Sequence, residues 1–330
     1  MKLRLTLACG DYDRTRALRD GEVQPEGIDL TYLTLPVEET FFRMLRHREF
    51  EVAEMSLSTY AASLFDADPS MIAIPIFTSR AFRHSGVFIN RSSGIREPQD
   101  LPGKVVGNPE YQLTACVWIR GILADHHGVP TDGVRYVTGG LEEPRRHEKL
   151  DLKLPERFDV SSLGGGKTLS EALAGGEIDA LYTPRAPSVF YDDGGRDVAR
   201  LWADSQAAEE AYFEATRIFP IMHMVVLRRD VYERAPWVAR SLIKAFVAAR
   251  DRAYERLRET AALSYMVPWL PQQNDRAVEL MGEDFWTYGL DANRKVLETF
   301  LEYHHEQGLS PRRLQPEDLF APETFESFAI

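Results

Sequence analysis

Alternation of apolar and polar residues predicts a β-strand at the start of the chain. Leu3, Leu5 and Leu7 alternate with charged or polar neighbours, which is the period of a strand with one buried face. A second strand is predicted over residues 28–33. The segment 36–50 then places its apolar residues largely at helical spacing. The chain therefore opens with two strands and a helix.

The same periodicities predict alternating strands and helices along the rest of the chain. The predicted strands are 71–77, 86–90, 104–107, 178–182 and 221–227, and the predicted helices are 110–125, 170–174 and 237–257, followed by a mostly helical tail from Asn274. Such alternation is typical of α/β proteins and indicates largely parallel sheets.

Length and composition predict two domains. A chain of 330 residues is too long for one ordinary core and suits two. Composition changes near residues 85–95 and 200–225, which indicates that the chain crosses between domains twice. We therefore expect two α/β lobes with a ligand cleft between them: lobe I from residues 1–88 and 225–330, and lobe II from residues 89–224.

The charge balance excludes two classes of partner. A net charge of −12 argues against nucleic acid and against membrane surfaces, because proteins that bind either one use a positive field. Only Cys9 and Cys116 are present, which suits a reducing compartment. The segment 6–9 loosely resembles a lipoprotein cleavage site, but Arg4 interrupts the short apolar run before it. We expect a cytoplasmic protein.

The candidate chemistry lies in the segments that follow the predicted strands, where open α/β sheets bind ligands. These segments are rich in polar and aromatic residues. The candidates for substrate binding are Asp11, Tyr12, Arg14, Ser56, Ser58, Arg80, Arg83, Tyr111 and Arg185, and the candidates for catalysis are His84, Glu110 and His223.

Arginines are the strongest candidates for binding an anionic ligand. Arg80, Arg83 and His84 are spaced so that one helical turn would put all three on one face, where they could clamp a dicarboxylate. A solvated charge cluster explains the same spacing equally well. Arg14 and Arg185 are open to the same two interpretations. His223 lies within a predicted apolar strand, so it is either a core residue or a proton-transfer group.

Motifs for phosphate and metal binding are absent or incomplete. Residues 164–168 resemble a phosphate loop, but Ser161 stands where the pattern requires glycine and no apolar strand leads into the segment. The histidine pairs 126–127 and 304–305 lack the spacing that puts two ligands on one helical face. We expect no metal and no cofactor.

Several segments resemble the 4,5-dihydroxyphthalate decarboxylases, which look like solute-binding proteins without an export signal. The resemblance spans most of the chain and rests on residues 5–18 (LTLACGDYDRTRAL), 54–60 (EMSLSTY), 80–85 (RAFRHS), 109–112 (PEYQ), 182–187 (YTPRAP) and 285–290 (FWTYGL). It implies a periplasmic-binding-protein type II fold, a non-oxidative decarboxylation that yields protocatechuate, and a homo-oligomer.

The expected chemistry requires a group that binds the dianion, a base and an acid. Ionising the hydroxyl para to a carboxylate pushes electrons toward the carbon that must be protonated as CO2 leaves. We assign Arg80 and Arg83, helped by Arg14 or Arg185, to the carboxylates. His84 is the leading proton donor, and Glu110 or His223 could deprotonate the phenol. Replacing His84 with Gln is expected to abolish turnover and spare binding.

Two other functions remain open at this point. The same fold could belong to a binding protein or sensor that captures a small aromatic acid without catalysis. It could also belong to another lyase or to an enzyme of thiamine-precursor synthesis, although no Cys-rich or His-rich motif favours the latter.

Overall fold

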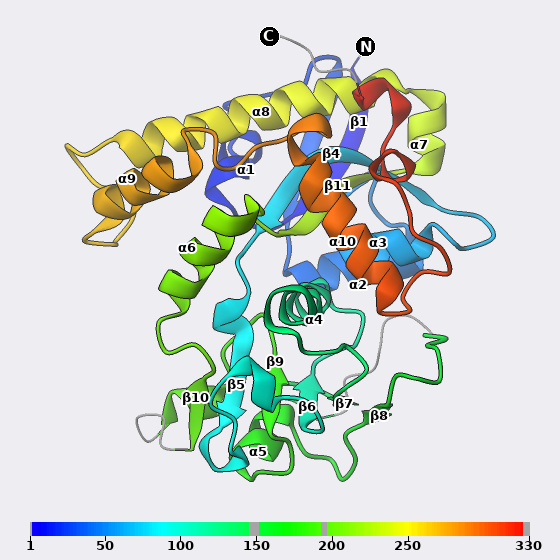
Figure 1. The fold of residues 1–330 in the computed structure, drawn as a ribbon. Coiled ribbons are helices and arrows are strands. Elements are labelled where there is room, and N and C mark those ends of the chain that lie inside the picture. The colour runs from blue at the N-terminus through cyan, green and yellow to red at the C-terminus, as the bar shows by residue number, and fades with distance from the viewer. Residues whose placement is uncertain (1, 145–151, 193–196, 326–330) are drawn as a thin grey trace. The chain divides into compact units, whose positions relative to one another are not determined.

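The computed structural model describes residues 2–144, 152–192 and 197–325, and the chain divides into two compact units (Figure 1). Unit 1 comprises Met1–Arg80, Ile221–Leu297 and Gln315–Ile330, and unit 2 comprises Ala81–Pro220 and Glu298–Leu314. The chain thus leaves unit 1 after Arg80 and returns at Ile221, where the sequence analysis placed these crossings after residues 88 and 224.

Unit 1 is built on a mixed sheet. Its strand order is β2 (Ile28–Thr34), β1 (Leu3–Cys9), β3 (Val52–Ser56), β11 (Ile221–Arg228) and β4 (Met71–Arg80). β1 pairs parallel with β2 and β3, whereas β11 pairs antiparallel with both β3 and β4. The expectation of largely parallel sheets is therefore wrong for the centre of this sheet, because β11 re-enters from unit 2 in the opposite direction.

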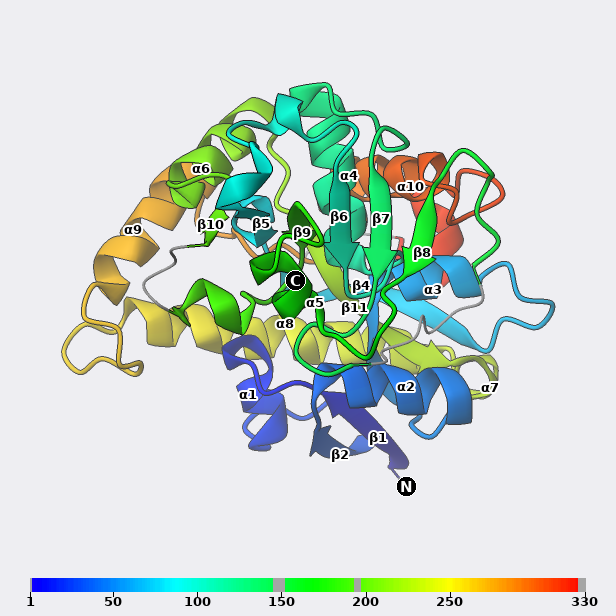
Figure 2. The ribbon, with the colours of Figure 1, turned by 90° about the horizontal axis from the view of Figure 1, so that it is seen from below.

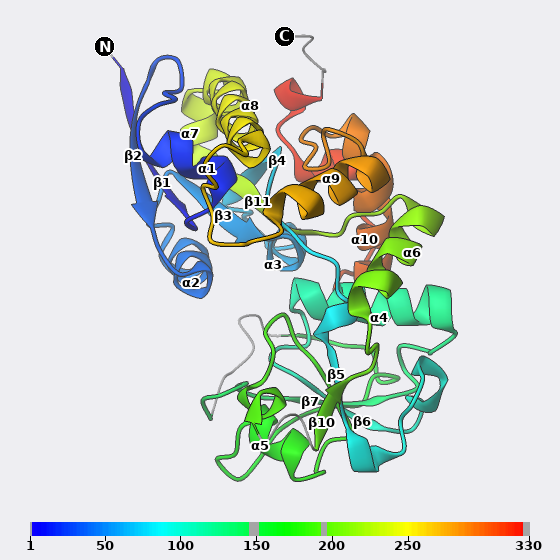
Figure 3. The ribbon, with the colours of Figure 1, turned by 90° about the vertical axis from the view of Figure 1, so that its left-hand side faces the viewer.

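Unit 1 also contains helices. They are α1 (Asp13–Arg19), α2 (Val37–His47), α3 (Leu57–Ser63), α7 (Arg229–Arg234), α8 (Trp237–Arg258), α9 (Leu270–Met281) and the start of α10 (Arg294–Glu306). α1 and α8 pack side by side (Figure 3). The buried face of α8 includes Leu242, Phe246 and Ala249, which follow the helical period of the sequence.

Unit 2 contains the second sheet. Its strand order is β10 (Val198–Arg200), β5 (Val87–Asn90), β9 (Ala180–Tyr182), β6 (Val105–Asn108), β7 (Arg135–Thr138) and β8 (Val160–Ser162). β6, β7 and β8 run parallel and lie side by side (Figure 2). β5 is antiparallel to both of its neighbours. The helices are α4 (Thr114–His127), α5 (Leu169–Ala174) and α6 (Ser205–Thr216).

Residues 298–314 belong to unit 2 because their side chains complete its core around α4. Phe300 packs on Trp118 with ring centroids 5.4 Å apart. Tyr303 fills the space over Gly121, where an added Cβ would lie 2.1 Å from the tyrosine ring. The sequence analysis had assigned this segment to lobe I, since a helical period does not reveal which core a helix completes.

Several local predictions need correction. Arg80, Arg83 and His84 do not share a helical turn, because Arg80 ends β4, where it pairs with Ile221, and His84 begins a short 3₁₀ helix (His84–Gly86). α4 starts at Thr114 rather than at residue 110. The sequence analysis did not identify α1, α3, α6, β7, β8 or β10. In the described part of the chain, no helix is long and apolar enough to cross a membrane.

Candidate active site

The antiparallel direction of β11 creates the polar edge of the unit 1 sheet. β11 begins where β3 and β4 end, so His223 lies opposite Ser56 on one side and Ser79 on the other. Glu54 pairs with Val225, two residues along β11 from His223. Because side chains alternate along a strand, Glu54 and His223 occupy the same face of the sheet as diagonal neighbours.

Glu54 is the centre of a hydrogen-bonded group in unit 1, here called the Glu54 cluster: Glu54, His223, Tyr12, Thr78 and the backbone of Gly10. The Glu54 side chain is fully buried, and its Oε1 lies 2.7 Å from His223 Nδ1. Oε1 also accepts from the Tyr12 hydroxyl at 2.9 Å and the Thr78 hydroxyl at 3.0 Å. Oε2 accepts from the Gly10 N–H at 3.0 Å. Every one of these contacts suits an ionised carboxylate.

The electrostatics agree with this geometry. Burial alone would raise the pKa of Glu54, but the hydrogen bond and charge of His223, together with the Gly10 N–H and the Tyr12 hydroxyl, bring the pKa below its ordinary value. Burial, followed by the negative charge of Glu54, raises the pKa of Tyr12. Near neutral pH the cluster therefore holds a glutamate anion and a protonated tyrosine that donates to it.

The backbone and one aromatic ring hold His223 in position. The pairing of β11 with β4 is irregular on either side of His223, and such bulges reorient a side chain at the rim of a sheet. The Phe41 ring packs edge-on against the imidazole, with centroids 4.9 Å apart. The His223 side chain remains 19% exposed. It is thus fixed through Nδ1 but still partly accessible.

Arg14 adds a fixed cation at the same edge of the sheet. Its guanidinium carbon lies 4.2 Å from the ring centroids of both Tyr12 and Trp286. Arg14 Nε donates to the Thr78 carbonyl at 2.6 Å, and a terminal nitrogen lies 3.1 Å from an Asp13 carboxylate oxygen. Two aromatic faces and a backbone carbonyl therefore hold this guanidinium in one orientation.

The other predicted residues of unit 1 have contacts that serve the fold. Arg80 is buried and donates to the Thr287 carbonyl at 2.7 Å and to the side chain of Asn293. Burial lowers the pKa of Arg80 to about 9, which still leaves it cationic at neutral pH. Asp11 forms an ion pair with Arg19.

The two predicted serines belong to the start of α3. Ser56 is the N-cap of α3, with its hydroxyl 3.5 Å from the Thr59 N–H. Ser58 is fully buried within the same helix. Both hydroxyls are thus placed by local helix structure.

In unit 2, His84 lies in an aromatic pocket instead of a hydrogen-bonded one. It is 4% exposed, and its ring lies 5.0 Å from that of Trp202 and 5.3 Å from that of Tyr212. Within the described residues its Nδ1 has no hydrogen-bond partner. Burial, followed by the charges of His127 and His126, lowers the pKa of His84 to about 4. The ring is therefore neutral at pH 7.

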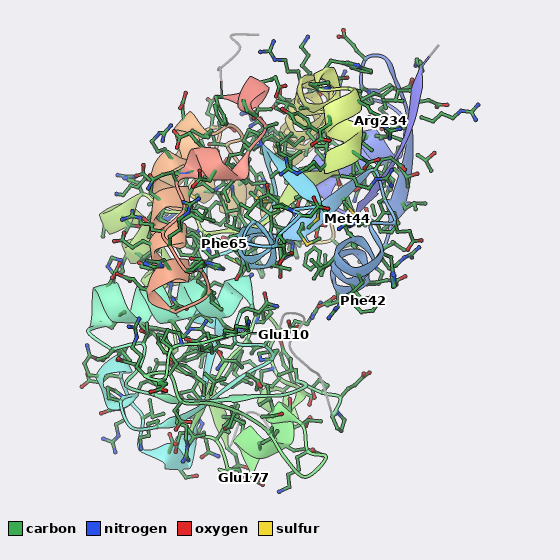
Figure 4. All side chains as sticks on the ribbon, turned by 90° about the vertical axis from the view of Figure 1, so that its right-hand side faces the viewer. Phe42, Met44, Phe65, Glu110, Glu177 and Arg234 are labelled. Atoms are coloured by element: carbon green, nitrogen blue, oxygen red, sulfur yellow. The ribbon has the colours of Figure 1, made fainter. Side chains whose placement is uncertain are left out.

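The remaining predicted residues of unit 2 have different surroundings. Glu110 is buried beside one end of α4 (Figure 4), where it accepts from the Gln112 amide at 2.8 Å. The buried Tyr111 donates to the Gln307 carbonyl at 3.2 Å, and burial lowers the pKa of Arg83 to about 10. Arg185 is exposed.

The structure thus brings together Tyr12, Arg14 and His223 among the predicted residues. The sequence analysis missed the roles of Glu54 and Trp286. A single carboxylate within the apolar strand Val52–Ser56 was the available signal for Glu54, because a buried acid needs partners. Among the described residues, no three His, Cys, Asp or Glu side chains are placed to hold a metal ion. Independence from metal remains a prediction.

Comparison with curated proteins finds close relatives. The 4,5-dihydroxyphthalate decarboxylase of Comamonas testosteroni is 44% identical over 329 residues, which cover 100% of this chain and 99% of that protein. A 4,5-dihydroxyphthalate decarboxylase of Pseudomonas putida is 44% identical over 214 residues, which cover 65% of this chain and 83% of that protein. No protein-family model matches the chain.

Solved structures reveal the fold. The putative periplasmic sulfonate-binding protein SsuA of Methylobacillus flagellatus aligns with a TM-score of 0.55 at 14% identity, covering 98% of this chain and 92% of that one. The aliphatic sulphonate-binding protein SsuA of Escherichia coli aligns with a TM-score of 0.51 at 11% identity, covering 98% of this chain and 99% of that one. The chain therefore has the periplasmic-binding-protein type II fold, as the sequence analysis expected.

Proposed function

Since this chain belongs to the 4,5-dihydroxyphthalate decarboxylase family, we propose that it removes one carboxylate of 4,5-dihydroxyphthalate, or of a close analogue, as CO2. The product is then protocatechuate or the matching analogue. The structural observation that carries the proposal is the pairing of the His223 Nδ1 with the buried carboxylate of Glu54 at 2.7 Å. A histidine held in this way is suited to accept a proton through its other nitrogen.

The reaction proceeds through three proton transfers. His223 takes the proton of the hydroxyl para to one carboxylate, and the resulting phenolate pushes electron density to the carbon that carries that carboxylate. An acid protonates this carbon. The bond to the carboxylate then breaks, its electron pair restores the aromatic ring, and CO2 leaves. The phenolate finally regains a proton, so the net reaction consumes one proton per carboxylate lost.

Arg14 is our candidate for binding one substrate carboxylate. Its planar guanidinium is oriented by Tyr12 and Trp286 and lies on the same sheet edge as His223. Arginine recognises carboxylates through paired N–H donors, and a preoriented guanidinium loses little entropy when it binds one. Arg83 remains our proposal for the second carboxylate, whereas Arg80 donates to Thr287 and Asn293 and Arg185 is exposed.

The candidates for the acid that protonates the ring carbon are His84 and Glu110. His84 was predicted for this step from the sequence, but a pKa of about 4 leaves it uncharged at neutral pH and therefore a weak proton donor. Glu110 is also buried. Variants of the two residues distinguish them.

The decisive experiment incubates purified, chelator-treated protein with 4,5-dihydroxyphthalate. CO2 release and the change in aromatic absorbance report turnover, and calorimetry reports binding under the same conditions. Turnover supports the proposal. Binding without turnover, unrelieved by added divalent metal, supports instead a binding protein or sensor, the function that the sulfonate-binding proteins of the same fold suggest. The absence of both binding and turnover contradicts the proposed substrate.

A cytoplasmic location and assembly into a homo-oligomer also remain proposals. The buried free thiols of Cys9 and Cys116 are compatible with a reducing compartment. Cell fractionation tests the location, and light scattering coupled to size-exclusion chromatography tests the assembly state.

A further inference from the structure

We propose that Glu54 is a positioning residue that fixes the tautomer of His223, with the proton on Nδ1 and the lone pair on Nε2. The proposal deepens the proposed function and rests on it, because it identifies which nitrogen of His223 accepts the substrate proton. The prediction of His223 as a base did not include a partner for its ring.

The donor and acceptor roles follow from the contacts of the carboxylate. The Gly10 N–H can only donate a hydrogen bond. The hydroxyls of Tyr12 and Thr78 also donate to Glu54, at distances of 3.0 Å or less. A fully buried carboxylate with these donors is ionised and can only accept hydrogen bonds. His223 Nδ1, 2.7 Å from Oε1, must therefore carry a hydrogen. In the neutral ring Nε2 is then the basic nitrogen.

The same carboxylate stabilises the product of proton transfer. When Nε2 takes up a proton, the ring becomes an imidazolium that already lies against an anion. A negative charge at hydrogen-bond distance in a buried site favours the charged form of histidine. Glu54 therefore occupies Nδ1 and leaves Nε2 to take up the substrate proton.

The surrounding structure keeps this arrangement rigid. Glu54 lies in the middle of β3, and His223 lies on the neighbouring strand, held between irregular pairings and the edge of Phe41. Neither side chain depends on a loop for its position. A ring held on two strands can return to the same orientation after each proton transfer.

The variant Glu54→Gln removes the charge and keeps the size of the side chain. The glutamine amide can be oriented in two ways. In one its NH2 group faces the N–H of His223 Nδ1, and in the other it faces the Gly10 N–H, so one pair of donors always face each other. Glu54→Asp retains the charge but shortens the reach. The matched control is Glu51→Gln, because the Glu51 carboxylate also accepts a backbone N–H of β1, from Thr6 at 2.9 Å, without contacting a histidine.

The first measurement is the tautomer of His223 itself, by nitrogen NMR of protein labelled with ¹⁵N-histidine. The resonances of His223 are assigned by their loss in His223→Gln. We expect a protonated Nδ1 and an unprotonated Nε2 in the wild-type protein and in Glu51→Gln. A wild-type ring protonated on Nε2 would overturn the proposal, whatever the activity of the protein and whether or not any variant folds.

The second measurement is kcat and KM at a fixed pH. We expect Glu54→Gln to lower kcat by about 10²–10⁴-fold with a smaller change in KM, because it alters the base and not the binding groups. Glu54→Asp should recover part of the rate, and Glu51→Gln should match the wild type.

Different results would contradict the proposed function and the positioning role of Glu54. If the wild-type protein has the expected tautomer but does not decarboxylate the substrate, the proposed function fails and the positioning role of Glu54 stands as a structural fact. If the wild-type protein is active and Glu54→Gln keeps both the His223 tautomer and the wild-type kcat, the positioning role fails and the proposed function stands.

Discussion

Each of the two units contains a candidate catalytic histidine, but in opposite surroundings. In unit 1, His223 contacts an ionised glutamate that also accepts hydrogen bonds from the Gly10 N–H and the hydroxyls of Tyr12 and Thr78. In unit 2, His84 is surrounded by Trp202 and Tyr212, and its Nδ1 has no partner among the described residues. The comparison shows that burial alone does not make a histidine reactive. The group bound to the second ring nitrogen decides whether a proton taken up by the first is stabilised.

The largest expected effect separates the two histidines by activity. His223→Gln should lower kcat by about 10³-fold, equivalent to about 4 kcal/mol of transition-state stabilisation, because the base is lost. His84→Gln should change kcat by less than about threefold, since a neutral ring donates weakly. Steady-state decarboxylation measures both, with calorimetry to check substrate binding. A reversed result, with His84→Gln inactive but still able to bind, would reinstate His84 as the proton donor predicted from the sequence.

The next effect is the contribution of His84 to the pH dependence of the free energy of unfolding. The pKa of His84 falls from about 6.5 to about 4 on folding, so the unfolded chain takes up this proton first as the pH falls. The contribution of His84 to the free energy of unfolding is therefore at its full value above pH 6.5. It should decrease by about 3 kcal/mol as the pH falls from 6.5 to 4.

Denaturant unfolding at several pH values measures this effect. His84→Gln should flatten the dependence on pH in that range. The exposed His47 provides the control, and His47→Gln should keep the wild-type slope. Equal slopes in the wild type and His84→Gln would mean that the pKa of His84 is the same in the folded and the unfolded chain.

A smaller effect distinguishes two of the predicted arginines. Arg14→Lys should raise KM about tenfold, or about 1.4 kcal/mol, because lysine keeps the charge but loses the planar donor pair. Arg185→Lys should change KM by less than about twofold, since Arg185 is an exposed side chain. The kcat of both variants should stay near the wild-type value. A larger effect at Arg185 than at Arg14 would move the carboxylate contact from unit 1 to unit 2.

Periodicity in the sequence predicted much of the fold. The strands β1 and β2 and the long helix α8 were identified because their buried positions repeat at the expected spacing. The antiparallel direction of β11 was missed, because the pattern of buried positions is the same whichever way a strand runs. Its direction depends on where the chain re-enters the sheet of unit 1.

The candidate site was predictable only in part. Tyr12 and Arg14 were found because they follow a predicted strand, and His223 was singled out as a titratable residue within a predicted apolar strand. Glu54 was passed over, because its importance depends on His223, which is 169 residues away along the chain. The prediction that Arg80, Arg83 and His84 share one helical face is wrong for a local reason. Residues three and four apart lie on one face only in a helix, and here β4 continues to Arg80.

The return of residues 298–314 to unit 2 affects how the protein can be made. During synthesis the main part of unit 2, Ala81–Pro220, emerges from the ribosome well before Phe300, Tyr303 and Gln307. Until then Trp118 lacks the ring of Phe300, and the buried Arg120 lacks the side-chain amide oxygen of Gln307, to which its Nε donates at 2.7 Å. A nascent chain that ends before residue 298 therefore exposes an unfinished apolar surface and leaves one donor of a buried cation without its partner. Unit 2 can reach its native packing only near the end of translation, although most of its residues are made in the first two thirds of the chain.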